Sequence, residues 1–151
     1  MTRSDRAGSA AALLAAWGVY PVTTGLYFIF VRPSLLPEDL RAAATTLAAI
    51  RAAAPRLEIW LDWVFVVMGG QMAASGVLLL SAAVRVASGH RIHDVELIAC
   101  IAAGLLSVAL MGGVNFALDS DFRWFLVVPM VLWLAAMIAL GRQVFETSPP
   151  Q

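Results

Sequence analysis

The sequence is poor in charged residues and in cysteine. Only 13% of its 151 residues are charged, and all ten basic residues are arginine. The formal net charge is zero, so bulk charge attracts neither nucleic acid nor an anionic surface. The single cysteine, Cys100, cannot close a disulfide within the chain, and no CxxC motif is present. These shortages exclude a dithiol oxidoreductase and give no support to nucleic-acid binding.

Catalytic signatures and clusters of metal ligands are also scarce. The sequence contains no P-loop and no recognisable Ser-His-Asp arrangement. Its two histidines, His90 and His93, share one polar segment with Asp94 and Glu96, but no second group of ligands accompanies them. Asp94 is better suited to cap a following helix. We therefore expect no metal, haem or other cofactor, and the sequence favours a protein that is not an enzyme.

Apolar residues, by contrast, make up 61% of the chain. A helix needs about 20 apolar residues to cross the hydrocarbon core of a bilayer. Four segments reach that length, at about 11–31, 59–84, 95–118 and 122–140. No soluble fold needs four such segments, whereas a helix satisfies its backbone hydrogen bonds within lipid. The prediction is an all-α integral membrane four-helix bundle, with residues 1–151 in a single membrane domain.

The first apolar segment could instead be a cleaved signal peptide. Arg3 and Arg6 precede it, as they would in a signal peptide. However, its apolar run continues through Tyr27 and Phe30, beyond the length of the apolar part of a signal peptide. We interpret this segment as an uncleaved first helix.

The short loops predict which side of the membrane the termini face. With four spans, both termini lie on the side of the 85–93 loop, which carries two arginines and two histidines. The loop at 119–123 reads Asp-Ser-Asp-Phe-Arg. Because basic loops tend to stay in the cytoplasm, cytoplasmic termini are favoured. The arginine-only, alanine-rich composition is typical of a GC-rich bacterial genome, so we expect a bacterial inner membrane.

The connection between the first two spans carries a helical pattern of its own. Pro37 suits a first helical turn, and Glu38 and Asp39 suit the positive end of the helix dipole. Apolar residues then recur at helical spacing, namely Leu40, Ala44, Leu47, Ile50 and Ala54. We predict one extramembrane amphipathic helix over about 37–54, which lies on the membrane surface or caps the bundle.

Small residues mark places where helices can approach closely in lipid, where hydrophobic burial contributes little to helix association. The second and third spans each contain the string MGG. The predicted packing positions are Gly69, Gly70, Ala73, Gly112 and Gly113. They can serve contacts within the chain or between copies of it.

Two prolines fall inside the predicted spans, Pro21 in the first and Pro129 in the fourth. A proline in a helix interior lacks the N–H that would bond to the carbonyl one turn earlier. We therefore expect kinks in the first and fourth helices.

Polar residues gather toward the non-cytoplasmic half of the predicted bundle. Gln71 and Asn115 lie within spans, where an unpaired amide is costly and must find a partner or water. The charged residues near the mouth of the bundle on that side are Glu58, Asp62, Asp119, Asp121 and Arg123. Glu58 and Asp62 are spaced i,i+4, so they share one helical face.

These polar residues have two interpretations. The first is a partly polar, ligand-binding cavity that opens to the non-cytoplasmic side and is floored by Gln71. The second is structural: Asp121 caps the fourth helix, and Gln71 bonds to a neighbouring helix. In that case Asp62 pairs with an arginine such as Arg123 or Arg56.

Three segments carry a resemblance to known proteins: GLYFIFVRPSLLPEDLR at 25–41, VFVVMGGQMAASG at 64–76, and NFALDSDFRW at 115–124. Together they resemble a group of small four-helix bacterial membrane proteins, and the resemblance extends over most of the chain. It implies the same membrane fold. The group has no assigned activity, so the resemblance implies no active site.

Three functions remain open at this point. The favoured one is a non-enzymatic subunit or accessory protein of a membrane complex or homo-oligomer. The second is a small oligomeric transporter or lipid-handling protein with a polar cavity, although the first span lacks the buried acid of small proton-coupled exporters. The third is a lipid-modifying enzyme using Glu58, Asp62 and Asp119, although no histidine or acid lies deep in a span.

Overall fold

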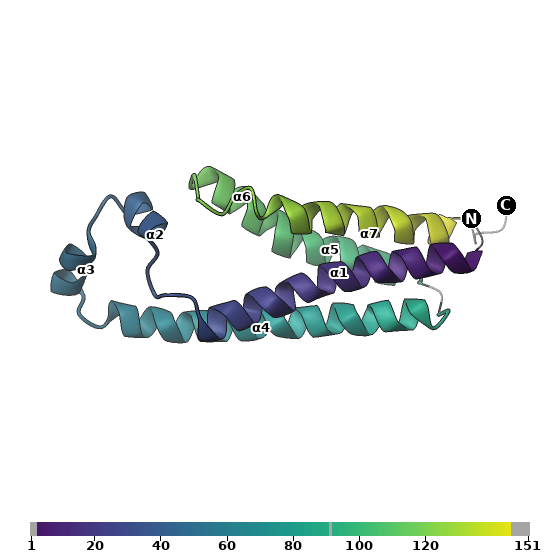
Figure 1. The fold of residues 1–151 in the computed structure, drawn as a ribbon, viewed down its shortest axis with the longest axis horizontal. Helices are drawn as coiled ribbons and strands as arrows, with labels where there is room; N and C mark the ends of the chain where they lie inside the picture. The colour runs from purple at the N-terminus through teal and green to yellow at the C-terminus, as the bar shows by residue number, and fades with distance from the viewer. Residues whose placement is uncertain (1–2, 91, 146–151) are drawn as a thin grey trace. The chain divides into compact units, whose positions relative to one another are not determined.

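The computed structural model of the chain describes residues 3–90 and 92–145. All regular structure within these ranges is helical (Figure 1). Four helical segments are long and apolar enough to cross a membrane: Asp5–Phe30, Leu57–Ala87, Asp94–Ala117 and Val127–Val144. The prediction of an all-α chain with four such segments is therefore confirmed.

The first two long helices begin before the apolar segments that predict them, and the second also ends later. The first and second long helices are α1 (Arg3–Phe30) and α4 (Leu57–Ala87). The third consists of α5 (Asp94–Gly104), a π-helical turn η1 (Leu105–Ala109) and α6 (Leu110–Ala117). Hydropathy marks only the part of a helix that matches the hydrocarbon core, whereas backbone hydrogen bonding continues into polar residues.

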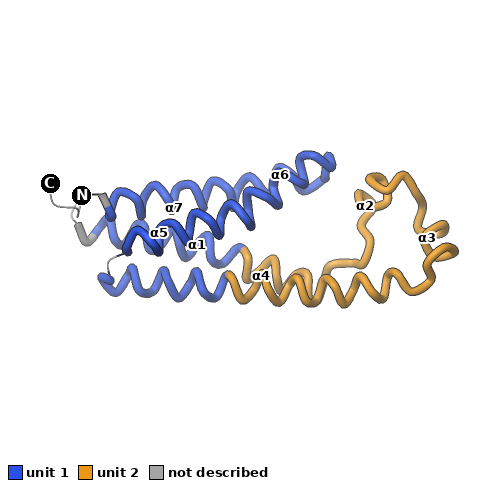
Figure 2. The backbone as a smooth tube through the Cα atoms, turned by 180° about the vertical axis from the view of Figure 1, so that it is seen from behind, with its two compact units in different colours: residues 1–20, 76–151 blue, residues 21–75 orange. Residues whose placement is uncertain are grey.

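The chain forms two compact units, which Figure 2 distinguishes by colour. Unit 1 comprises residues 1–20 and 76–151, and unit 2 comprises residues 21–75. Both α1 and α4 run without interruption through the boundaries at 20/21 and 75/76. Each unit therefore contains part of both helices, and only unit 2 contains the long connection between them.

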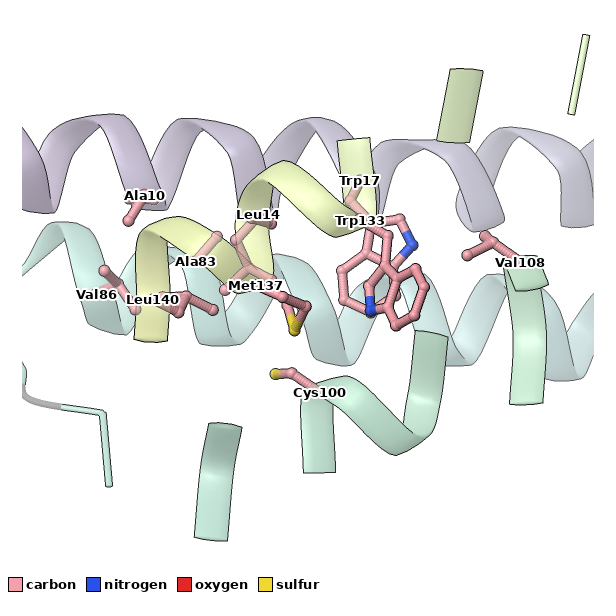
Figure 3. Close-up of a cluster of buried hydrophobic side chains, with 12 residues drawn as sticks. Ala10, Leu14, Trp17, Ala83, Val86, Cys100, Val108, Trp133, Met137 and Leu140 are labelled. Carbon is pink, nitrogen blue, oxygen red and sulfur yellow. The ribbon is translucent and has the colours of Figure 1, made fainter. Parts of the chain in front are cut away.

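Unit 1 has an apolar core to which all the long helices contribute (Figure 3). Its buried side chains are Ala10, Ala11, Leu14, Trp17, Ala83, Val86, Cys100, Val108, Trp133, Ala136, Met137 and Leu140. Trp17, Leu14 and Leu140 are the largest of those that are almost completely enclosed. In lipid, such a core is held by close van der Waals contact, since the surroundings are equally apolar.

The π-helical turn in the third long helix was not predicted, because the sequence indicated a regular helix over 95–118. The turn begins directly after Gly104, against which the Trp133 indole packs. A Cβ at position 104 would overlap Nε1 of Trp133. Only glycine therefore admits the indole at this point of the helix.

The fourth long helix, α7 (Val127–Phe145), begins later than the predicted segment 122–140. Turns occupy residues 121–126. Pro129 is thus the third residue of α7, where no intrahelical hydrogen bond exists for it to remove. The predicted mid-span position and kink of Pro129 are wrong, whereas Pro21 does lie inside α1.

The predicted single amphipathic helix over 37–54 is also wrong, because the connection forms two short helices, α2 (Pro37–Ala42) and α3 (Leu47–Ala53). Ala44 between them has a φ of 48°, a left-handed conformation that interrupts a right-handed helix. Thr46 then starts α3 anew, since its hydroxyl accepts a hydrogen bond from the Ala49 amide at 3.2 Å. Neither short helix has a buried residue.

Candidate functional site

The residues of the predicted cavity are divided between the two units. Unit 2 contains Glu58, Asp62 and Gln71, and unit 1 contains Asn115, Asp119, Asp121 and Arg123. Within each unit, most of these side chains have hydrogen-bond or ionic partners of their own. Those partners decide what each residue can do.

The polar centre of unit 2 is Arg32, which lies two residues after the end of α1. Its guanidinium carbon lies 3.6 Å from the ring centroid of Phe65 and 5.3 Å from that of Phe28. The same group bonds to the Asp39 carboxylate at 3.2 Å and donates to the Pro33 carbonyl at 2.8 Å. The Arg32 side chain is only 9% exposed. Its charge is thus stabilised by two aromatic faces, one carboxylate and the carbonyls of Pro33 and Ser34.

This arginine ties together three parts of unit 2. Phe28 lies one helical turn before Arg32 in α1, Phe65 lies in α4, and Asp39 lies in α2. Asp39 also accepts a hydrogen bond from the Leu36 amide at 2.8 Å, which supports the start of α2. The sequence analysis did not identify this role of Arg32. An arginine one turn after a phenylalanine at the end of an apolar span is the signal that could have indicated it.

Glu58 and Asp62 hold the connection to the first turns of α4. The Arg51 guanidinium donates to both carboxylate oxygens of Glu58, at 2.7 and 3.1 Å. These hydrogen bonds raise the pKa of Arg51 above its ordinary value. Ser34 donates to Asp62 through its hydroxyl at 2.6 Å. Asp62 thus has a serine hydroxyl where the structural interpretation expected an arginine.

The polar residues of unit 1 stabilise the turn between α6 and α7. Asn115 donates through its side-chain amide to the Met111 carbonyl at 2.9 Å, within its own helix. Arg123 forms an ion pair with Asp119 and also donates to the Ser120 carbonyl. These interactions fold the turn between the two helices.

Asp121 does not cap the fourth helix, contrary to the structural interpretation. It is exposed and lies six residues before Val127, where α7 begins. A capping side chain must reach the first free amides of its helix, which lie within about one turn. The chain instead approaches α7 through consecutive turns, including a bond from the Val127 amide to the Trp124 carbonyl at 3.3 Å.

The predicted packing residues have different surroundings. Gly69 and Ala73 of α4 lie against Gly25 of α1, and a Cβ at Gly25 would overlap the Gly69 carbonyl. Gly112 lies against the Met130 sulfur. By contrast, a Cβ at Gly70 or Gly113 would meet no heavy atom within 4 Å. One glycine of each MGG string therefore faces a neighbour, and the other faces open space.

Gln71 lies exposed on α4 and makes no side-chain hydrogen bond to any residue in the described ranges. Its backbone carbonyl accepts a bond from the Ser75 hydroxyl at 2.8 Å. Among the residues of the predicted cavity, Gln71 is therefore the one whose side chain has no hydrogen-bond partner in the part of the chain that the structure describes.

Two buried donors in unit 1 were not identified from the sequence. The indole nitrogens of Trp17 and Trp133 are enclosed, and neither has an acceptor among the residues that the structure describes. Leaving a buried donor unpaired costs about 1–3 kcal/mol. A sequence does not show this cost, because it depends on the direction of each ring.

The polar segment that contains both histidines starts α5. His93 is the residue before the helix, and its amide donates to the Glu96 carboxylate at 3.0 Å. Arg85 bonds to the same carboxylate at 3.0 Å. Asp94 is the first residue of α5 and not its cap. Over residues 3–90 and 92–145, no three histidine, cysteine or acidic side chains are grouped as a metal would require.

Compared with protein-family models, curated proteins and solved structures, the chain matches nothing. The resemblance of its three segments to small bacterial membrane proteins therefore stays a prediction. Any function must be argued from the contacts of the chain itself.

Proposed function

We propose that this protein is an integral membrane protein that acts as a non-enzymatic subunit or accessory protein, and that it associates with a membrane partner or with itself through one face of α4. We call this surface the Gln71 face. It consists of Trp60, Trp63, Val67, Gly70, Gln71 and Ala74.

The Gln71 face follows α4 through unit 2. Its residues recur three or four positions apart, so they share one side of the helix. All of them are exposed. At its centre, Gly70 and Ala74 present almost no side chain, so another helix can approach the α4 backbone closely there.

Gln71 distinguishes this face from an ordinary surface toward lipid. A glutamine amide carries two N–H donors and one carbonyl acceptor, and each is costly to leave unpaired in hydrocarbon. Polar side chains in membrane helices usually face a protein or an aqueous cavity. A helix that pairs with Gln71 gains about 0.6–2 kcal/mol from the hydrogen bond in addition to close packing.

The other polar residues support the same conclusion. Glu58, Asp62 and Asp119 each hold a turn or the connection through bonds to a neighbouring side chain. A catalytic or transport role would need at least one such group directed toward a substrate. The Gln71 face is the feature that carries the proposal.

Cysteine cross-linking in native membranes tests the association through the Gln71 face. Cys100→Ala first removes the native thiol, and single cysteines then replace Gly70, Gln71 or Ala74. We expect oxidation to produce either a dimer of this chain or an adduct with one identifiable membrane protein. Gln71→Leu should weaken the same association in mild detergent.

Matched control positions lie on the other side of the helix. Val66 and Ala73 are half-buried in unit 2, and Ala73 packs against Gly25. Cysteines at these positions should give no adduct. The proposal is wrong if no position on the Gln71 face forms an intermolecular adduct, whether the face is then turned toward lipid or covered by another part of the same chain.

The proposed location is a bacterial inner membrane with both termini in the cytoplasm, on the basis of the basic 85–93 loop. The connection with α2 and α3 then lies outside the cytoplasm. A membrane-impermeant thiol reagent added to intact cells should label a cysteine at Ala48 and spare one at Ser88, both of which are exposed. The opposite labelling would reverse the orientation and leave the association through α4 untouched.

A further inference from the structure

The two enclosed tryptophans of unit 1 each carry an indole N–H donor for which the described residues of the core supply no hydrogen-bond acceptor. Trp17 is 1% exposed and Trp133 is 7% exposed, and both belong to the same buried cluster (Figure 3). Neither indole nitrogen has an acceptor among the residues described. An indole N–H can donate but cannot accept, so the missing group at each ring is an acceptor atom.

The surroundings determine the charge of that acceptor. The cluster around the two rings consists of aliphatic and sulfur-containing side chains, such as Leu14, Cys100 and Met137, and the partly buried Tyr20 packs against it. A carboxylate or phosphate placed there would lose its hydration without gaining a cation from the cluster. A neutral oxygen loses far less on entering, so it is the acceptor that fits.

The backbone around Trp133 is irregular at the same point. Nε1 of Trp133 is the heavy atom nearest to the position that a Cβ of Gly104 would take. The π-helical turn η1 starts at the next residue, Leu105. Such turns occur often at functional sites, because they change the direction of side chains and disturb the regular hydrogen-bond ladder. An unpaired donor therefore lies beside an irregular backbone in the middle of an apolar core.

We propose that unit 1 holds a neutral hydrogen-bond acceptor in its core, bonded to the indole N–H groups of Trp17 and Trp133 beside the π-helical turn. The acceptor is an uncharged oxygen, supplied either by ordered water or by a carbonyl group of a membrane-soluble molecule. This proposal depends only on unit 1, so it is independent of association through the Gln71 face.

The indole N–H resonances of the protein in lipid nanodiscs test the proposal directly. Of the five tryptophans, Trp17 and Trp133 are assigned by the variants Trp17→Phe and Trp133→Phe in protein labelled with ¹⁵N-tryptophan. We expect both resonances at the chemical shifts of hydrogen-bonded indoles. Trp63→Phe is the matched control, because Trp63 is 67% exposed and lies in unit 2.

Two further measurements distinguish the sources of the oxygen. Magnetisation transfer from water to the two indole protons, with no organic molecule in a solvent extract, supports ordered water. A carbonyl compound that co-purifies in a fixed ratio, and is lost from the Trp17→Phe, Trp133→Phe double variant, supports an organic ligand.

The wild-type spectrum alone can overturn the proposal. Two indole resonances at the shifts of free indole in an alkane solvent mean that the donors are unpaired, and the proposal then fails. If one phenylalanine variant does not fold, the contact of Trp133 with Gly104 still assigns the Trp133 resonance through proton–proton transfer. The variants Trp60→Phe, Trp63→Phe and Trp124→Phe assign the three exposed tryptophans, which leaves Trp17 by elimination.

Discussion

The two units use different chemistry to hold the same two helices. In unit 1, α1 and α4 contribute Leu14, Trp17, Ala83 and Val86 to an apolar core that also receives side chains from the third and fourth long helices. In unit 2, α1 and α4 approach backbone to backbone at Gly25 and Gly69. The connection of unit 2 is then fastened by Arg32, Asp62 and Glu58.

This difference follows from what each part of the helices has around it. Where four helices surround a core, large side chains such as Trp133 fill the space between them and glycine accommodates the rings. Where only two helices and an extended connection are present, burial is limited, and polar contacts to the connection supply the specificity. Substitutions in one unit should therefore act through volume, and in the other through backbone approach and charge.

The largest effect is expected from filling the space at Gly104. Gly104→Leu places a side chain where the Trp133 indole lies, which should lower the free energy of unfolding by about 3 kcal/mol or more. Reversible unfolding by SDS in mixed micelles measures this change in the free energy of unfolding. Gly113→Leu is the control, because no heavy atom lies within 4 Å of the position that its Cβ would take. Equal destabilisation by both variants would contradict the packing of unit 1.

A somewhat smaller effect is expected at the helix crossing of unit 2. Gly25→Ala should cost about 2 kcal/mol, since a Cβ there overlaps the backbone carbonyl of Gly69 and the two helices must separate. Hydrogen exchange of peptides from α4 should rise within residues 57–75 and remain low in α7. The matched variant Gly70→Ala should leave exchange as in the wild type, and a rise there as well would contradict the close approach at Gly25.

Loss of the guanidinium at Arg32 should have an intermediate effect. Arg32→Lys keeps the charge but loses the planar group that contacts Phe65 and bonds to Asp39. We expect a loss of about 1–2 kcal/mol and faster proteolysis of the connection. Arg41→Lys provides a control on an exposed arginine of α2. If Arg32→Lys and Arg41→Lys are indistinguishable, Arg32 is not the centre of unit 2.

The smallest effect is expected from the exposed Arg51–Glu58 pair. Glu58→Gln removes the ion pair but retains a side chain of similar size, so the connection should become only slightly more accessible to protease. The difference from wild type should shrink as salt is added, because exposed ion pairs are screened. A difference that persists in concentrated salt would show that Glu58 acts through something other than its charge.

Several parts of the fold could be predicted from the sequence, and the reasons for the failures are specific. Long apolar runs revealed all four long helices, since a run of that length has few other uses. The connection was predicted as one helix and not two because spacing alone cannot show that Ala44 adopts a left-handed conformation. Pro129 was placed mid-span because hydropathy continues through the turns that precede α7.

The candidate site was predictable only in part, for a related reason. Gln71 could be recognised because an amide in an apolar helix is costly whatever surrounds it. Arg32 and the two indoles could not, because their significance depends on which side chains approach them from elements distant in the sequence.

The sequence by itself determined the helical class, the number of long apolar helices and the position of the unusual amide at Gln71. These follow from composition and from backbone hydrogen bonding, which are local. Only the tertiary structure decided which glycine of each MGG string meets a neighbour, that Arg32 lies between aromatic rings, and that Trp17 and Trp133 have donors without acceptors. Such outcomes depend on distances and directions between helices, and the order of residues along one helix does not contain them.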